Sequence, residues 1–231
     1  MQNIHTIYGN PPPLCRIYER LFSFIDNTLP NFRVLNTKSD GNRVTAEDDI
    51  TEDLADFLDS EQESLNQDLN FSFRFTNQSS SSDIGVKLGR GYTAKNRKSF
   101  CWIEAKILPT PNAGKNRDER EYVFVDKKIK NKNYKRKYRG NGGIQRFKEG
   151  KHAPTLTHSI MIGYIQDRNN VDFWLSKINS WITDLANTEN TFWSIEDCLE
   201  MNLSGKCNRF LSTHKRKDGK TIEIHHYWIK C

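Results

Sequence analysis

The stretch Phe100-Cys101-Trp102-Ile103-Glu104-Ala105-Lys106-Ile107-Leu108 decides the fold, and it ends at Pro109. Its β-branched and aromatic residues predict a β-strand that is buried on both faces. Side chains alternate along a strand, so Glu104 and Lys106 share one face. A buried carboxylate and a buried ammonium are costly unless they are paired or hold a metal ion. The strand therefore predicts a functional site, and its other face predicts core positions at Cys101, Ile103, Ala105 and Ile107.

An isolated aspartate precedes this strand. Asp83 follows a run of serines and begins the short apolar piece Ile84-Gly85-Val86, after an alternating run at residues 71–75. A hairpin that returns to the strand would bring Asp83 beside Glu104. Two hard carboxylate ligands suit Mg²⁺, with Mn²⁺ as a substitute. Lys106 would then orient the attacking water or offset charge that grows on a phosphate. The alternative is a surface aspartate and a chance Glu-x-Lys triplet.

A third acidic group is expected at the start of a helix. Thr45-Ala46-Glu47-Asp48 predicts a capping box, in which hydroxyl and carboxylate bond reciprocally to backbone amides. Glu47 lies on the apolar stripe of this helix, so it points toward the sheet. The alternative is that Glu47 only complements the helix dipole. The stripe consists of Ile50, Leu54, Phe57 and Leu58.

Taken in order from Thr45 to Ala186, these segments resemble the PD-(D/E)XK, or restriction-endonuclease-like, nuclease superfamily. The resemblance implies an α/β fold with an αβββαβ core and a mixed central sheet flanked by helices. It assigns Asp83 and Glu104 as catalytic metal ligands, Glu47 as the helix acid that assists them, and Lys106 as the residue that acts on water. Ser82 stands where the family usually has proline.

The segment Gly142-Gly143-Ile144-Gln145-Arg146-Phe147 and the run Ser159-Ile160-Met161-Ile162-Gly163-Tyr164-Ile165 resemble the second helix and fourth strand of the same superfamily. The resemblance implies that Gln145 helps to hold the nucleotide or water, and that Arg146 lies near the metal site. A helix N-terminus is also a ready phosphate site. The alternative is an ordinary amphipathic helix.

Two basic segments flank the expected site. Basic side chains interleaved with tyrosines favour contacts to phosphates and stacked bases, although a solvated surface run is the alternative. Within the long insertion 109–141, residues 120–125 predict an added strand. The insertion carries Lys127, Lys128, Lys130, Lys132, Lys135, Arg136, Lys137 and Arg139, and the loop after Asp83 carries Lys87, Arg90, Lys95, Arg97 and Lys98. With Arg146, these are the expected nucleic-acid-binding residues, and DNA is the favoured partner.

Composition sets wider bounds. The 231 residues suit a single domain, and a net charge of +6 is compatible with a nucleic-acid partner. No apolar run is long enough to span a bilayer and no signal peptide is seen, so a cytoplasmic protein is expected. The five scattered cysteines predict reduced thiols. A structural zinc is not expected, because the paired spacings of zinc sites are missing among Cys207, His214, His225, His226 and Cys231.

The two ends predict additions to the core. Residues 14–29 predict an amphipathic helix with Leu21, Phe22, Phe24 and Ile25 buried, and residues 171–182 predict another strong helix. Residues 209–212 and 221–224, joined across Asp218-Gly219, predict a hairpin that adds edge strands to the sheet. The expected single nuclease domain of 1–231 thus has a core at about 45–186, a helical extension at 1–44 and a hairpin extension at 187–231.

The function expected from the residues and the resemblance is that of a Mg²⁺-dependent endodeoxyribonuclease with a role in bacterial defence. The alternative is a catalytically inactive or partner-gated nucleic-acid-binding subunit of a larger complex. A homodimer or a protein of a defence system is the expected protein partner, because a double-strand cut is simplest with two copies of one site. The choice between DNA and RNA as substrate, and any sequence specificity, stay open at this point.

Overall fold

The computed structural model describes residues 14–34, 47–65, 73–77, 83–88, 99–111, 113, 117–125, 142–189, 191–201 and 209–231. Four α-helices and seven β-strands form in this part of the chain. The elements are α1 (Leu14–Thr28), a 3-10 turn η1 (Leu29–Asn31), α2 (Glu47–Leu65), β1 (Phe73–Asn77), β2 (Asp83–Leu88), β3 (Cys101–Leu108), α3 (Gly143–Lys148), β4 (His158–Ile165), α4 (Val171–Ala186), a 3-10 turn η2 (Ile195–Asp197), β5 (Glu200–Met201), β6 (Arg209–Lys215) and β7 (Thr221–Lys230).

The strands form one mixed sheet of seven strands in the order β1-β2-β3-β4-β7-β6-β5. Strands β1, β2 and β3 pair antiparallel, β3, β4 and β7 pair parallel, and the last pairs are antiparallel again. The expected mixed sheet flanked by helices is confirmed. The succession α2-β1-β2-β3-α3-β4 is also the αβββαβ order expected from the sequence.

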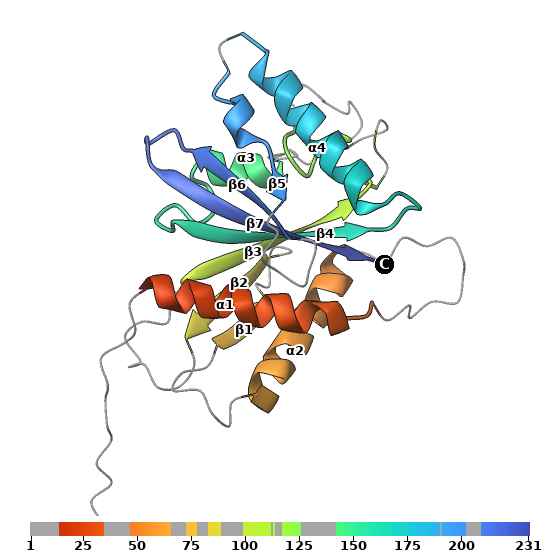
Figure 1. Cartoon of the computed structure of the whole chain (residues 1–231), viewed down its shortest axis with the longest axis vertical. Helices are drawn as coiled ribbons and strands as arrows, with labels where there is room; N and C mark the ends of the chain where they lie inside the picture. Colours follow the sequence, from red (N-terminus) through yellow and green to blue (C-terminus); the bar gives the residue numbers. More distant parts are fainter. Residues whose placement is uncertain are drawn as a thin grey trace, which may run out of the picture.

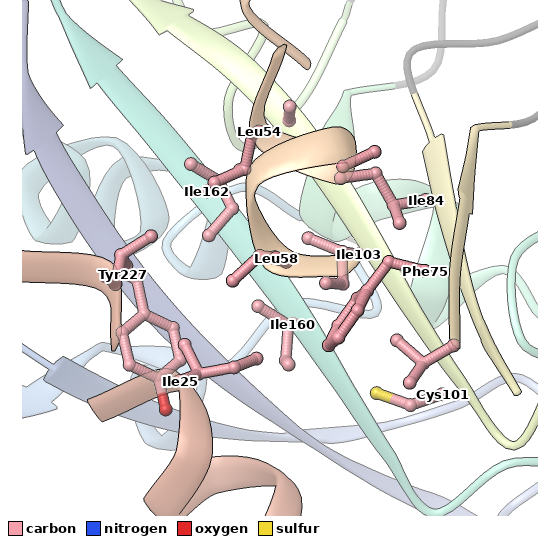
Figure 2. Packing of buried hydrophobic residues seen from close by; sticks show 14 of the residues in the cluster. Ile25, Leu54, Leu58, Phe75, Ile84, Cys101, Ile103, Ile160, Ile162 and Tyr227 are labelled. Atoms are coloured by element: carbon pink, nitrogen blue, oxygen red, sulfur yellow. The ribbon is translucent and has the colours of Figure 1, made fainter. Parts of the chain in front are cut away.

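Helices cover both faces of the sheet, so that it forms the middle layer (Figure 1). Helices α1 and α2 lie on one face, and α3 and α4 lie on the other. On the first face, Leu54 and Leu58 of α2 pack against Ile103, Ile160 and neighbouring strand residues (Figure 2). On the second face, the tryptophans of α4 and Phe147 of α3 pack against the other side of β4, β6 and β7.

The central strand β3 alternates as its sequence predicts. Cys101, Ile103, Ala105 and Ile107 belong to the core on the α1–α2 face. Leu108 and the partly buried Trp102 belong to the core on the opposite face. Since side chains alternate along a strand, Glu104 and Lys106 lie on that opposite face as well. The burial of both faces explains why this strand is apolar nearly throughout.

The terminal elements were predicted correctly in type, but the hairpin lies deeper in the sheet than expected. Helices α1 and α4 and the β6–β7 hairpin form at the predicted positions, and the two strands are longer than predicted. Both hairpin strands extend the sheet beyond β4, as expected, but neither is its outermost strand. Strand β7 lies between β4 and β6, and the short β5 forms the outer strand. Burial explains this position, because β7 alternates large apolar side chains on both faces.

The prediction of an added strand at residues 120–125 was also wrong. The segment forms a turn, in which the amides of Val123 and Phe124 both donate to the Arg120 carbonyl at 2.7 Å. Asp118 favours this turn because its carboxylate accepts from the Arg120 amide and guanidinium at 3.0 Å. These local bonds compete with strand pairing.

Among the described helices, none has the length and apolar character needed to cross a membrane.

Candidate active site

Asp83 and Glu104 lie directly opposite each other on neighbouring strands. They are Cα partners in the antiparallel register of β2 and β3. Opposed residues of an antiparallel pair share a face of the sheet, so position 83 lies on the face that carries Glu104. The predicted juxtaposition of these two positions along the hairpin is therefore confirmed at the level of the backbone.

Glu104 is a buried carboxylate surrounded by cationic groups. Its side chain is 1% exposed, and its Oε1 atom lies 2.8 Å from Arg146 Nη1 and 3.3 Å from Lys106 Nζ. His152 Nδ1 lies 2.8 Å from Oε2. Burial alone would raise the pKa of Glu104, but Lys106, His152 and Arg146 outweigh it and hold the pKa well below the usual range. Glu104 is therefore ionised.

Lys106 joins this carboxylate to the helix acid. Its Nζ donates to Glu47 Oε1 at 2.9 Å, and Glu47 Oε2 accepts from the backbone amide of Ile107 at 3.2 Å. Burial would lower the pKa of Lys106, but the carboxylates of Glu104 and Glu47 raise it above its ordinary value. Lys106 is thus a fixed ammonium that donates hydrogen bonds and cannot serve as a base near neutral pH. Because the N-terminus of α2 supplies Glu47, the expected approach of Glu47 to the Glu-x-Lys face is confirmed.

Arg146 lies close to Glu104, as expected of a residue near the site. Its guanidinium forms an ion pair with Glu104 and is 28% exposed, and its contact with nucleic acid stays a prediction. His152 follows α3 and was missed in the sequence, although it lies as close to Glu104 as Arg146 does. A single histidine after a basic segment forms no sequence pattern that would identify it as a site residue. Only the turn after α3 brings it back to β3.

Gln145 holds the start of α3. Its Oε1 atom accepts from the backbone amides of Gly142 at 3.0 Å and Val125 at 3.2 Å, and its Nε2 donates to Glu149. These bonds satisfy backbone donors at the helix start. They use both ends of the Gln145 amide within the α3 region, and the expected contact with nucleotide or water stays a prediction.

The 121–124 turn fixes the position of α3 relative to β3. The amides of Gly143, Ile144 and Gln145 donate to the carbonyls of Glu121, Tyr122 and Val123 at 2.9–3.2 Å. A Cβ at Gly142 would overlap the backbone of Phe124 and Val123, so only glycine permits this close approach. Gly142, the N-cap residue of α3, therefore permits the approach that seats α3 where Arg146 reaches Glu104.

A chain of buried polar side chains supports this turn from the C-terminal hairpin. It runs from Asp197 through His214, Ser212 and His226 to the hydroxyl of Tyr122, with successive separations of 2.8, 2.7, 2.7 and 2.8 Å. Burial lowers the pKa of both histidines, so both are neutral.

The direction of every hydrogen bond in this chain then follows. A carboxylate only accepts, so His214 Nδ1 donates to Asp197 and its Nε2 accepts from Ser212. Ser212 has no second proton, so His226 Nε2 donates to it and His226 Nδ1 accepts from Tyr122. Trp228 Nε1 completes the chain by donating to the Tyr122 oxygen at 3.0 Å. The network fixes one orientation for each side chain.

The expected nucleic-acid contacts lie mostly outside the described residues. Lys87 is described, lies in β2 and is half-buried. Cys207 is not part of the described chain. Neither are the other members of the two basic segments, which are Arg90, Lys95, Arg97, Lys98, Lys127, Lys128, Lys130, Lys132, Lys135, Arg136, Lys137 and Arg139.

The residues at the site suit a hard divalent cation. Glu104 contributes a buried carboxylate whose Oε2 lies 2.8 Å from His152 Nδ1, and Glu47 contributes a second carboxylate that also pairs with the Lys106 ammonium. Position 83 is opposite Glu104 in the strand register. Oxygen donors of this kind are those that Mg²⁺ and Mn²⁺ prefer. Comparisons of the chain with family models, with curated proteins and with solved structures find no match.

Proposed function

We propose that this protein is a metal-dependent nuclease of the PD-(D/E)XK type that hydrolyses phosphodiester bonds, with DNA as its substrate. The observation that carries the proposal is the pairing of Asp83 with Glu104 across β2 and β3. Lys106 shares the face of Glu104, and Glu47 reaches Lys106 from the start of α2. The acid, acid and Glu-x-Lys pattern expected from the sequence thus converges on one region of the sheet.

The chemistry follows from the charges of these groups. Asp83, Glu104 and Glu47 are the residues that would hold Mg²⁺, and the ion would activate a water molecule and offset negative charge on the phosphate. Lys106 is protonated, so it would orient the water through a donated hydrogen bond or stabilise the phosphate oxygens. Glu47 holds the Lys106 ammonium in place at 2.9 Å.

One observation favours a second candidate, a nucleic-acid-binding subunit whose cutting is gated by a partner or by the substrate. The guanidinium of Arg146 and the ammonium of Lys106 both lie on Glu104 Oε1. An ion that binds Glu104 competes with Arg146 for this oxygen. Arg146 is partly exposed, so a phosphate can draw it away from Glu104. Bound nucleic acid or a protein partner would then open the site, and a role in bacterial defence is compatible with such gating.

The nuclease is tested by incubating purified protein with labelled single- and double-stranded DNA and RNA, in Mg²⁺, in Mn²⁺ and in chelator. We expect DNA cleavage that requires the metal ion and is lost in Asp83→Asn and in Glu104→Gln. Asp26→Asn is the matched control, since Asp26 is a partly buried carboxylate of α1 that pairs with Arg209 on the opposite face of the sheet. Cleavage that survives both site variants would contradict the proposal. Tight binding without cleavage in any condition would favour the gated subunit.

A further inference from the structure

A second group of ligating side chains lies on the other face of the sheet, beneath α1. His158 begins β4, and Glu223 and His225 lie near the start of β7. The parallel register of the two strands makes His158 and Glu223 Cα partners. One ligand atom from each of the three side chains lies within 4.8 Å of the other two. Strand pairing therefore gathers two imidazoles and a carboxylate that are far apart in the sequence.

The three side chains converge on one oxygen atom. Glu223 Oε1 lies 3.2 Å from His158 Nδ1 and 2.9 Å from His225 Nε2. Ligand atoms about 2.0–2.1 Å from a tetrahedral ion are roughly 3.3 Å apart, so these separations are close to those that a zinc site needs. Small side-chain rotations are enough to reach metal-binding geometry.

The hydrogen bonding of His225 is otherwise unexplained. Its side chain is 6% exposed, yet neither ring nitrogen makes a hydrogen bond of normal geometry among the described residues. His158 Nδ1 is buried and lacks a hydrogen bond in the same way. Buried polar atoms nearly always have a partner, and a missing ion is one recognised reason for an exception. A metal ion bound to one nitrogen of each imidazole would give those two nitrogens a partner.

Aromatic rings of α1 pack against both imidazoles, and one nitrogen of each imidazole lies close to Glu223. The Phe22 ring stacks on His225 at 3.5 Å between centroids, and the Tyr18 ring lies 4.4 Å from that of His158. Arg209, whose positive charge acts on His225, is paired with Asp26 at 2.9 Å, and this pairing reduces its repulsion of a bound cation.

We propose that His158, Glu223 and His225 bind a Zn²⁺ ion that ties the start of β4 to the start of β7 under α1. Two imidazoles and one carboxylate form a donor set typical of zinc. His158 and Glu223 are about one-third exposed, so a water molecule can complete the coordination. The site is separate from the Glu104 cluster, which lies on the opposite face. It was not expected from sequence spacing, because its ligands come from two strands that meet only in the fold.

Calorimetric titration of the chelator-treated full chain with Zn²⁺ alone tests this site. We expect a single tight equivalent in the wild type, and a loss of affinity of at least about tenfold in His158→Gln, Glu223→Gln and His225→Gln. Because His225 is buried, the His158 and Glu223 variants keep the test valid if His225→Gln fails to fold. Glu121→Gln, which changes a carboxylate that pairs with Arg117 and is no proposed metal ligand, is the matched control and should bind Zn²⁺ as the wild type does.

Two results would overturn the proposal. One is that the wild-type protein does not bind one equivalent of Zn²⁺ tightly. The other is Zn²⁺ binding that survives in Glu223→Gln and His158→Gln but is lost in Glu104→Gln, which would assign the ion to the Asp83–Glu104 site instead. Co²⁺ provides a second readout, since tetrahedral coordination gives it an intense visible absorption that should appear in the wild type and vanish in Glu223→Gln. Nuclease activity is not used, so failure here is distinct from failure of the nuclease.

Discussion

Arg146 Nη1 lies 2.8 Å from Glu104 Oε1, so a guanidinium occupies the carboxylate that a metal ion would use. A charge-assisted bond of this kind contributes about 1.5–3 kcal/mol. Removing it should therefore free Glu104 for a cation. The same contact ties α3 to β3, which links the state of the site to the position of the helix.

Replacing Arg146 with methionine should strengthen divalent-metal binding at the Glu104 site by about tenfold or more, because the competing cation is lost. The affinity is measured by titrating the protein with Mn²⁺ while the electron paramagnetic resonance signal of the free ion is recorded. Arg33→Met is the control, since Arg33 is exposed and bonds only to backbone carbonyls in the described chain. Equal affinity in the wild type and Arg146→Met would argue against competition.

Glu104→Gln should destabilise the fold by about 3 kcal/mol, because it leaves two cations near a buried neutral group. The matched Glu121→Gln removes a partly exposed ion pair with Arg117, and its expected cost is about 0.5 kcal/mol. Urea unfolding measured by circular dichroism gives both values. Similar losses in the two variants would mean that Glu104 is not the centre of a buried charge network.

Stability should fall in mild acid because of the buried histidines. Burial lowers the pKa of His214 and His226, so the folded chain holds fewer protons than the unfolded chain below an ordinary histidine pKa of about 6.5. The contribution of the two histidines to the free energy of unfolding is complete above that pH. It is lost as the pH falls below it, by up to about 1.4 kcal/mol per pH unit for each histidine.

Urea unfolding between pH 8 and pH 5 tests this dependence in chelator-containing buffer. His226→Gln should be less stable than the wild type at pH 8 and should lose less stability on acidification. An unchanged slope in His226→Gln would show that the network is not what acid disrupts.

Neutralising the basic insertion should weaken nucleic-acid binding without abolishing metal binding. Each lost phosphate contact lowers the slope of log affinity against log salt by about 0.9 for duplex DNA. Fluorescence anisotropy over a range of salt concentrations measures the slope. The control neutralises the hairpin residues Lys215, Lys217 and Lys220. The variant replaces Lys127, Lys128, Lys130, Lys135, Arg136, Lys137 and Arg139 with serine. An unchanged affinity would mean that the insertion is not the binding surface.

The fold was predictable where its determinants are local. Alternation in β3, the amphipathic stripe of α2 and the Asp83–Glu104 pairing each follow from spacing within a short segment or across one hairpin. The inner position of β7 was not predictable in this way. It depends on a parallel pairing with β4, and strands that pair in parallel are joined through distant crossover segments.

The residues of the site were likewise predictable only where their positions depend on one strand or one helix. Glu47, Glu104 and Lys106 were identified by strand and helix periodicity and by the resemblance, whereas the contacts of Arg146 and His152 with Glu104 depend on how α3 docks. The network from Asp197 to Tyr122 requires three separate segments to meet in the core. No pattern in one segment indicates such a meeting.

The most direct test of the proposed nuclease compares wild type and Lys106→Met on the same labelled DNA in Mg²⁺, with binding and cleavage measured in parallel. Lys106→Met keeps the length of the side chain but removes the ammonium that Glu47 and Glu104 hold. We expect DNA affinity to change little and cleavage to fall by at least about a hundredfold, because a stabilising charge is lost from the transition state. Cleavage by Lys106→Met at the wild-type rate would contradict the assignment of this site.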